Sequence, residues 1–559
     1  MSNGKWLLAL MCAAPIGPSD LLAQRGIGPV DQFPYRPGID VQHYDVALTL
    51  PLRGSDVRAT ATLDIRRARS VDTLRLDLIA MAVDAVTVNG KRRTAARDSA
   101  GILVPLRPAD GTRLRVGVRY HGAPGDGLII REDSTRGWSA FGDNWPNRAR
   151  YWIPSVDHPS DKATVSWQVT APVGRTIIAN GARLTPSASV RHRDGSRWVT
   201  TRFRLTQPIP TYLMVVGAAA LQETILGATA CGAAIGGGCV PQSVWTFGPE
   251  TATMPGNFRE AGRIVSTFAK LAGPFVYPRL SHVQSATRFG GMENATAIFY
   301  SDRAFRDNAV AVGLIAHETA HQWFGNAVTP RRWADLWLSE GVSTYLAAVY
   351  TQRARGDSTF AAELRRIRAE ILSAPVVSQR PVVDSIGGEA PLTLLNANSY
   401  QKGGFVLHML RAQIGDDAFF GALRDYQRRY RHGTATTDDL REAMEHRSGT
   451  PLSSFFSQWL HRPGWADLTI SWTWNADASS LVMQVVQGTR FPPFALPLTM
   501  VVRDVDGHEV TVRTALNAVL SQQVVLKVSG VREVSDLLAD PKVELLGSVT
   551  LLRAMPSSR

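Results

Sequence analysis

The sequence predicts an α+β chain of several domains: a mostly antiparallel β domain first, an α-rich domain in the middle, and a small β-sandwich last. Three observations support this. At 559 residues the chain is too long for one domain of about 100–200 residues. Apolar residues make up 44% and charged residues 19%, which excludes the disordered, collagen-like and coiled-coil classes. The apolar spacing also changes from period two to helical and back.

The first 24 residues have the pattern of a signal peptide. Lys5 supplies a positive charge, an apolar stretch follows over residues 6–14, and Leu21-Leu22-Ala23 ends the segment before Gln24. This apolar run is too short to span a bilayer as a permanent helix, and no later segment is long and apolar enough. We therefore expect a signal peptide over 1–24 and an exported mature chain, periplasmic or secreted.

The next range, 25–245, is predicted to be the N-terminal β domain. Apolar and polar residues alternate over 44–50, 60–65 and 73–78, and turn residues bound each run. Near the end of this range lie Cys231 and Cys239, the two cysteines left after leader removal. The glycine-rich loop between them lets the thiols meet, and an oxidising compartment favours a disulfide. Two buried free cysteines are the alternative.

Residues 246–462 form the predicted α-rich domain, and residues 463–559 the predicted β-sandwich. Helical apolar spacing recurs over 258–271, 309–324, 334–353 and 403–414. The helix-stopping cluster His461-Arg462-Pro463-Gly464 ends this range. Strand periodicity then returns over 468–474 and 496–502.

The formal net charge of +13 raises the question of an anionic partner. The densest basic runs, 66–69 and 428–431, are short and far apart. An unclustered charge of this kind is typical of a solvated surface, so we expect no nucleic-acid partner. The oligomeric state leaves no mark in the sequence.

A metal-binding pattern lies within the α-rich range, at His317-Glu318-Thr319-Ala320-His321. On a helix, imidazoles at i and i+4 share one face and can bind one metal ion, with the glutamate beside the open coordination position. Two surface histidines are the alternative. Catalytic zinc takes three protein ligands and keeps a fourth position for water, so a third ligand is needed.

Glu340, eighteen residues after His321, is the candidate third ligand. Here the sequence resembles the M1 family of zinc aminopeptidases, whose pattern is His-Glu-x-x-His, eighteen residues and a Glu. The flanking segments match the family as well, namely Gln322-Trp323-Phe324-Gly325-Asn326 and Asp335-Leu336-Trp337-Leu338-Ser339. The resemblance implies a thermolysin-like catalytic domain with one Zn²⁺ per chain, although the donor set tolerates other divalent ions.

Two further motifs support the resemblance. Gly290-Gly291-Met292-Glu293-Asn294 resembles the family's Gly-x-Met-Glu-Asn box, which binds the substrate's free amino terminus and backbone. Glycines permit close backbone approach, and Glu293 offers a carboxylate to an α-ammonium. Tyr400 begins a Tyr-x-Lys-Gly segment whose tyrosine in that family stabilises the tetrahedral intermediate. Without the resemblance, a surface glutamate and a packing tyrosine would be the ordinary interpretations.

These motifs together imply a zinc aminopeptidase that acts on peptides with a free N-terminus and releases single amino acids. Glu318 is expected to accept the proton of a zinc-activated water and return it to the leaving amine. A thermolysin-type endopeptidase and a non-catalytic scaffold of this family are the alternatives.

The sequence departs from the family pattern at a residue that helps to hold the substrate's α-amine. Many family members carry a Gln where this chain reads Phe141-Gly142-Asp143-Asn144-Trp145-Pro146, with Asp143 or Asn144 as candidate replacements.

Overall fold

The computed structural model describes residue 31 and residues 35–186, 189–192, 194–227, 231–248, 256, 258–306 and 310–554. The predicted signal peptide, 1–24, lies outside the described residues. The chain divides into two compact units that interleave along the sequence. The first comprises Met1–Ser339, Ser385–Leu395 and Arg424–Asp439; the second comprises Glu340–Asp384, Asn396–Leu423 and Leu440–Arg559. The predicted domain bounds at residues 245 and 462 stay a prediction.

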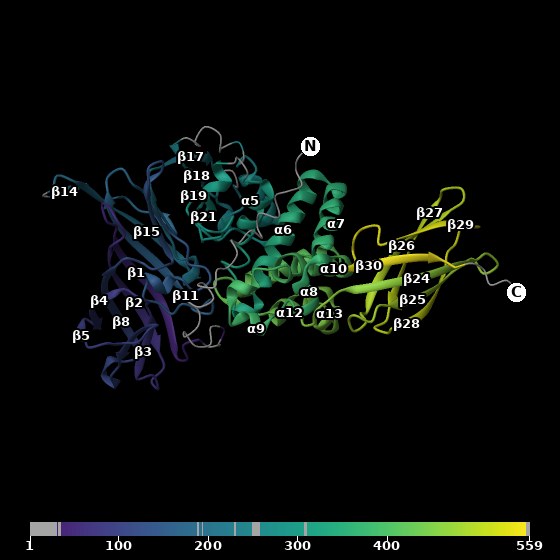
Figure 1. Cartoon of the computed structure of the whole chain (residues 1–559), viewed down its shortest axis with the longest axis horizontal. Helices are drawn as coiled ribbons and strands as arrows, with labels where there is room; N and C mark the ends of the chain where they lie inside the picture. Colours follow the sequence, from purple (N-terminus) through teal and green to yellow (C-terminus); the bar gives the residue numbers. More distant parts are fainter. Residues whose placement is uncertain are drawn as a thin grey trace. The chain divides into compact units, whose positions relative to one another are not determined.

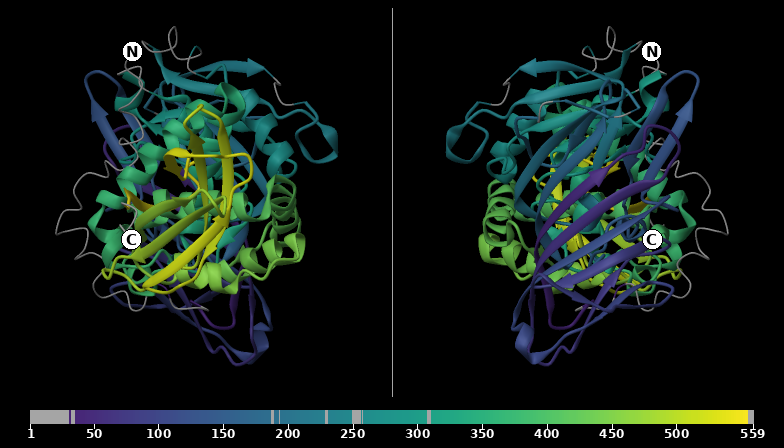
Figure 2. Two further views of the ribbon diagram at one scale, coloured as in Figure 1. Left: turned by 90° about the vertical axis from the view of Figure 1, so that its right-hand side faces the viewer. Right: turned by 90° about the vertical axis from the view of Figure 1, so that its left-hand side faces the viewer.

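A nine-stranded sheet forms the N-terminal part of the first unit (Figure 1). Its order is β13-β15-β11-β1-β2-β8-β4-β5, and β14 also pairs with β15. The right view of Figure 2 shows its long purple and blue strands side by side. All pairs are antiparallel except β1 with β11. The strands are β1 (Ile39–Thr49), β2 (Val57–Arg67), β4 (Ala82–Val88), β5 (Lys91–Arg93), β8 (Arg113–Gly122), β11 (Lys162–Pro172), β13 (Ala182–Arg183), β14 (Val190–Arg191) and β15 (Arg197–Pro210).

Four smaller sheets complete the described β structure of the first unit, and the smallest pairs β22 (Thr329–Pro330) with β23 (Thr434–Ala435). One has the order β3 (Thr73–Asp77), β7 (Gly101–Pro105), β6 (Ala96–Arg97). The next has the order β12 (Thr176–Ala179), β16 (Val216–Ala219), β10 (Gly137–Gly142), β9 (Leu128–Asp133). The last is mixed, with the order β17 (Leu221–Gly227), β18 (Gln242–Phe247), β19 (Leu280–Ser285), β21 (Ala297–Ser301), β20 (Gly291–Met292). These sheets confirm the prediction of a mostly antiparallel N-terminal β region.

The predicted helices are present, with bounds that differ by a few residues. They are α3 (Ala261–Ala272), α4 (Asp302–Arg306), α5 (Val312–Ala320), α6 (Trp337–Arg355), α7 (Asp357–Ser373), α8 (Pro375–Gln379), α9 (Ser385–Gly388), α10 (Gly403–Ile414), α11 (Asp416–Tyr430), α12 (Thr437–Ser448) and α13 (Ser453–Leu460). The expected helix over 309–324 ends at Ala320 instead. Gly325 has a φ of +117°, which a right-handed helix does not allow, so the chain turns away there.

The C-terminal part of the second unit is a pair of sheets, as predicted for 463–559. The first has the order β28 (Ser521–Lys527), β25 (Ser480–Gln487), β24 (Ala466–Asn475), β30 (Gly547–Arg553). The second has the order β27 (Glu509–Leu516), β26 (Leu496–Asp504), β29 (Val534–Ala539). Alternate residues such as Leu468, Ile470, Met500 and Val502 are fully buried between them. This alternation is what a two-sheet core requires.

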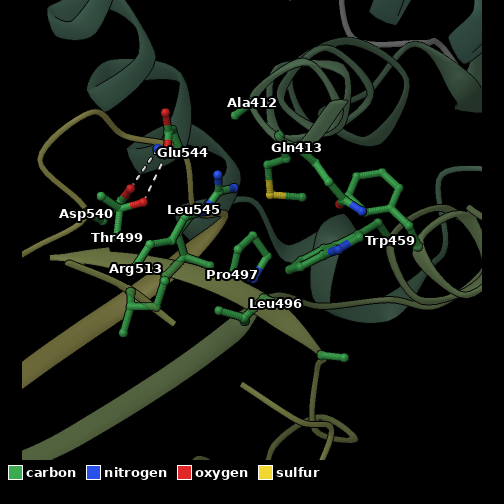
Figure 3. Close-up of a pocket in the computed structure, with 14 residues that line it drawn as sticks. Ala412, Gln413, Trp459, Leu496, Pro497, Thr499, Arg513, Asp540, Glu544 and Leu545 are labelled. Atoms are coloured by element: carbon green, nitrogen blue, oxygen red, sulfur yellow. Dashed lines mark hydrogen bonds between the residues drawn. The ribbon is translucent and has the colours of Figure 1, made fainter. Parts of the chain in front are cut away.

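Within the second unit, helices α10 and α13 pack against this sandwich around a small pocket (Figure 3). The Gln458 amide bonds to the backbone of Ala495 in both directions. Trp459 stacks on Phe494, with ring centroids 4.5 Å apart. These contacts attach the sandwich to the helices of its own unit.

Two further predictions concern the described residues. Cys231 and Cys239 form a disulfide, as predicted. No helix in the described part of the chain is long and apolar enough to cross a membrane.

Candidate metal centre

Two imidazoles meet on the buried face of α5. His317 and His321 stand one helical turn apart, and their Nε2 atoms lie 3.0 Å from each other. Both side chains are almost completely buried. The i, i+4 spacing thus directs two nitrogen ligands to one point, as the sequence predicted.

The second ring nitrogen of His321 is held from outside the helix. His321 Nδ1 lies 3.1 Å from the Phe324 carbonyl oxygen and 3.0 Å from Ser339 Oγ. A carbonyl oxygen only accepts hydrogen bonds, so Nδ1 carries the proton and Nε2 keeps its lone pair for a metal. A Cβ at Gly325 would overlap Ser339 Oγ, which is why only glycine fits here.

Glu340 brings a carboxylate to the same point. It follows Ser339 in the first turn of α6, and Ser339 is the residue that contacts His321. One ligand atom each from His317, His321 and Glu340 lie within 4.8 Å of one another. Two buried imidazoles with one carboxylate are the donor set of a three-ligand zinc site with an open position, so these residues fit Zn²⁺.

Glu318 lies between this ligand set and the Gly-Gly-Met-Glu-Asn segment. One carboxylate oxygen of Glu318, one of Glu293 and one ring nitrogen of His321 form a second group of atoms that lie within 4.8 Å of one another. The backbone of Gly291 passes so close that a Cβ there would overlap Glu318 Oε1. Burial, reinforced by the charge of Glu318, raises the pKa of nearby Tyr300 well above its usual value.

Hydrogen bonds fix the main chain of that segment. Gly291 and Met292 form β20, which pairs with β21. The carbonyl oxygen of Glu293 accepts bonds from Gln322 Nε2 at 2.9 Å and from Asn326 Nδ2 at 2.7 Å. Asn294 is fully buried. Gln322 and Asn326 belong to a motif visible in the sequence, but their role in holding this carbonyl oxygen is evident only in the structure.

The candidates for replacing the family glutamine are both engaged elsewhere. The Asn144 amide bonds to the carbonyls of Thr211 and Met214 and accepts from Trp152 Nε1. Asp143 is fully buried and forms ion pairs with Arg148 at 3.1 Å and Arg288 at 3.3 Å. Asp143 therefore anchors the chain just before Gly290.

Tyr400 lies in a π-helical turn, η9 (Asn398–Lys402), directly before α10. A Cβ at Gly341 would stand 3.0 Å from both the Ser399 carbonyl oxygen and the Gly403 backbone. This close approach of α6 and η9, within the second unit, puts the neighbours of Glu340 and Tyr400 in contact. The role of Tyr400 toward an oxyanion stays a prediction.

Comparisons with known proteins agree with this site. The model of the Peptidase M1 N-terminal domain matches residues 41–213, and that of the Peptidase family M1 domain matches residues 260–459. The chain belongs to peptidase family M1. The resemblance inferred from the motifs is thereby confirmed, and with it the metallopeptidase class.

Among M1 proteins of known sequence, leukotriene A-4 hydrolase of Xenopus laevis is 25% identical over 76% of this chain and 72% of its own length. Aminopeptidase N of Streptomyces lividans is 28% identical over 76% of this chain and 50% of its own length. Leucyl aminopeptidase of Saccharolobus solfataricus is 24% identical over 78% of this chain and 55% of its own length. The chain thus spans only about half the length of the latter two relatives.

Solved M1 structures share the fold. A mutant of an M1 zinc metallopeptidase from Deinococcus radiodurans superposes with a TM-score of 0.64 at 26% identity, over 77% of this chain and 95% of that one. A two domain M1 zinc metallopeptidase bound to L-arginine gives the same TM-score. These likenesses support the predicted α+β class, and the family implies zinc as the metal.

Proposed function

We propose that this M1 chain is a zinc-dependent aminopeptidase that releases single N-terminal amino acids from peptides. The observation that carries the proposal is the position of Glu293, whose carboxylate lies within 4.8 Å of ligand atoms of Glu318 and His321. A carboxylate pairs strongly with an α-ammonium. Its closeness to the reacting groups leaves room for one amino acid between that ammonium and the scissile carbonyl. The aminopeptidase names of the relatives support the proposal.

The residues of the site divide the chemistry among them. His317, His321 and Glu340 would hold Zn²⁺, and the bound ion would serve as a Lewis acid toward water and a carbonyl group. Glu318 accepts the proton of the attacking water and delivers it to the leaving amine. Tyr400 donates a hydrogen bond to the developing oxyanion.

A hydrolysis screen over aminoacyl chromogenic amides, with and without a chelator, tests the proposal. We expect chelator-sensitive cleavage of free-amine substrates and none of their N-acetylated counterparts. Equal rates on both would refute the role of Glu293. Cleavage products from inside an unblocked peptide would identify a thermolysin-type endopeptidase, and inactivity on every peptide would favour a scaffold.

We also propose that the chain is exported and processed. The Cys231–Cys239 disulfide supports an oxidising compartment, since such bonds persist outside the cytosol. The intact mass of the protein recovered from periplasm or medium should correspond to loss of residues 1–24. A full-length mass there would contradict the predicted leader.

A further inference from the structure

A lysine of the N-terminal sheet is bonded to the loop that follows the metal-binding helix. Lys162, the first residue of β11, directs its Nζ at three carbonyl oxygens, those of Asn326 at 2.9 Å, Ala327 at 3.0 Å and Gly433 at 2.9 Å. An ammonium has three donors, and here each donor has one acceptor. Lys162 is half-buried, and desolvation of its ammonium end lowers its pKa to about 7.

Two of the three acceptors of this lysine belong to the segment that organises the site. Asn326 and Ala327 lie in the loop of residues 322–328, which we call the zinc-helix loop. Its Phe324 carbonyl oxygen orients His321, and its Gln322 and Asn326 amides hold the Glu293 carbonyl oxygen. Displacement of this loop would therefore reach both a metal ligand and the proposed amine-binding carboxylate.

Loss of the ammonium would leave carbonyl groups facing one another. Two of these oxygens also accept a second hydrogen bond, that of Ala327 from the His432 amide and that of Gly433 from the Thr329 amide. Three carbonyl dipoles that converge without a cation repel one another, and their enclosed lone pairs lose a partner. The loop is thus expected to shift when the charge is removed.

We infer that Lys162 is a positioning residue for the M1 site, which holds the zinc-helix loop so that His321 and Glu293 are correctly placed. Nothing in the sequence motifs assigns this role to Lys162. The part that concerns Glu293 rests on the proposed aminopeptidase function, whereas the part that concerns His321 requires only the metal.

The test uses the zinc-loaded full chain and Lys162→Met, with Lys270→Met as the matched control because Lys270 is exposed on α3. Two constants are measured. The first is zinc affinity, by competition with a chelator, which we expect to weaken about tenfold, as for other changes behind a metal ligand. The second is the affinity ratio of leucine hydroxamate to its amine-free analogue, 4-methylpentanohydroxamate, measured by calorimetry.

The hydroxamate ratio separates positioning from general loosening. Both compounds bind the metal and share a side chain, and only leucine hydroxamate has an amine for Glu293. We expect the ratio to fall severalfold in Lys162→Met and to stay unchanged in Lys270→Met. A folded Lys162→Met with wild-type zinc affinity and ratio overturns the inference. Should Lys162→Met fail to fold, Lys162→Gln, which keeps two donors without charge, is judged by the same two constants.

Failure of the proposed function would look different. A wild-type chain that hydrolyses no unblocked peptide refutes the aminopeptidase proposal. A zinc affinity that nevertheless falls in Lys162→Met would still support the positioning of His321.

Discussion

At the scale of single residues, the site depends on a few side chains and glycines whose replacement would change its chemistry or its packing. Glu318 is one of them, because it lies on the metal-ligand helix with its carboxylate close to that of Glu293. Gly325 is another, because any side chain there meets the pair formed by His321 and Ser339. Each residue leads to a prediction, one about catalysis with zinc still bound and one about the affinity for zinc.

We predict that Glu318→Gln binds zinc normally and loses about 10²–10⁴-fold in kcat, since an amide cannot accept the water proton. Zinc content by elemental analysis and kcat on an aminoacyl amide measure the two properties. A variant with wild-type kcat would exclude Glu318 as the general base.

We predict that Gly325→Ala weakens zinc binding about tenfold, because the new methyl group displaces Ser339 from His321. Chelator competition gives the affinity. The matched control is Gly415→Ala, which has a φ of +83° but no atom within 4 Å of the added Cβ. It shares the backbone strain without the overlap, so equal zinc affinities in the two variants would contradict the prediction.

At the scale of elements, the contact between α6 and the η9–α10 segment, within the second unit, positions the residues next to Glu340 and Tyr400. Glycines at 341 and 404 allow the two backbones to approach closely. Glu340 precedes Gly341, and Tyr400 follows Ser399, whose carbonyl oxygen Gly341 approaches. A wider separation of these elements would therefore move a metal ligand and the predicted oxyanion donor together.

We predict that Gly341→Ala lowers the free energy of unfolding by about 1–3 kcal/mol, as for other overpacked contacts. It should also lower kcat. Urea unfolding and steady-state kinetics test this. Gly313→Ala on α5 is the control, because its Cβ meets nothing within 4 Å. A Gly341→Ala variant as stable and active as this control would show that the contact tolerates a methyl group.

At the scale of the whole molecule, buried histidines should make the fold sensitive to acid. Burial lowers the pKa of His158 and of His282 to about 3, and that of His408 to about 4. In the unfolded chain a histidine has a pKa of about 6.5. Around and below that pH the unfolded state takes up protons that the folded state excludes, so this contribution to stability is complete only well above pH 6.5 and is lost as the pH decreases.

We predict that the free energy of unfolding falls between about pH 7 and pH 5, with a slope that approaches about 1.4 kcal/mol per pH unit for each buried imidazole. Urea unfolding across this range measures the slope. His282→Gln, whose side chain stays neutral, should remove the contribution of one imidazole and so reduce the slope by up to about 1.4 kcal/mol per pH unit. Burial raises the pKa of Asp31 and of Asp540 to about 6, so these carboxyls add a slope of opposite sign below that pH. The comparison with His282→Gln is therefore decisive, and an unchanged slope in this variant would contradict the assignment of His282 as neutral.

Much of the site was predictable because its key residues are close in sequence. The spacing of His317 and His321 on one helix is a local property, and it placed both rings correctly. The order of strands and helices likewise followed from periodicity. The end of α5 was not predictable in this way, because the apolar pattern continues to Phe324 while the helix ends at Ala320.

The sequence by itself determined the metal-ligand set, the family and the α+β order of elements, since these depend on residue types and short spacings. Only the tertiary structure decided which groups hold the ligands in place. Ser339 and Phe324 orient His321, Asn326 and Gln322 hold Glu293, and Lys162 binds the loop between them. Such contacts join residues up to 271 positions apart, and the folded backbone alone brings them within hydrogen-bonding distance.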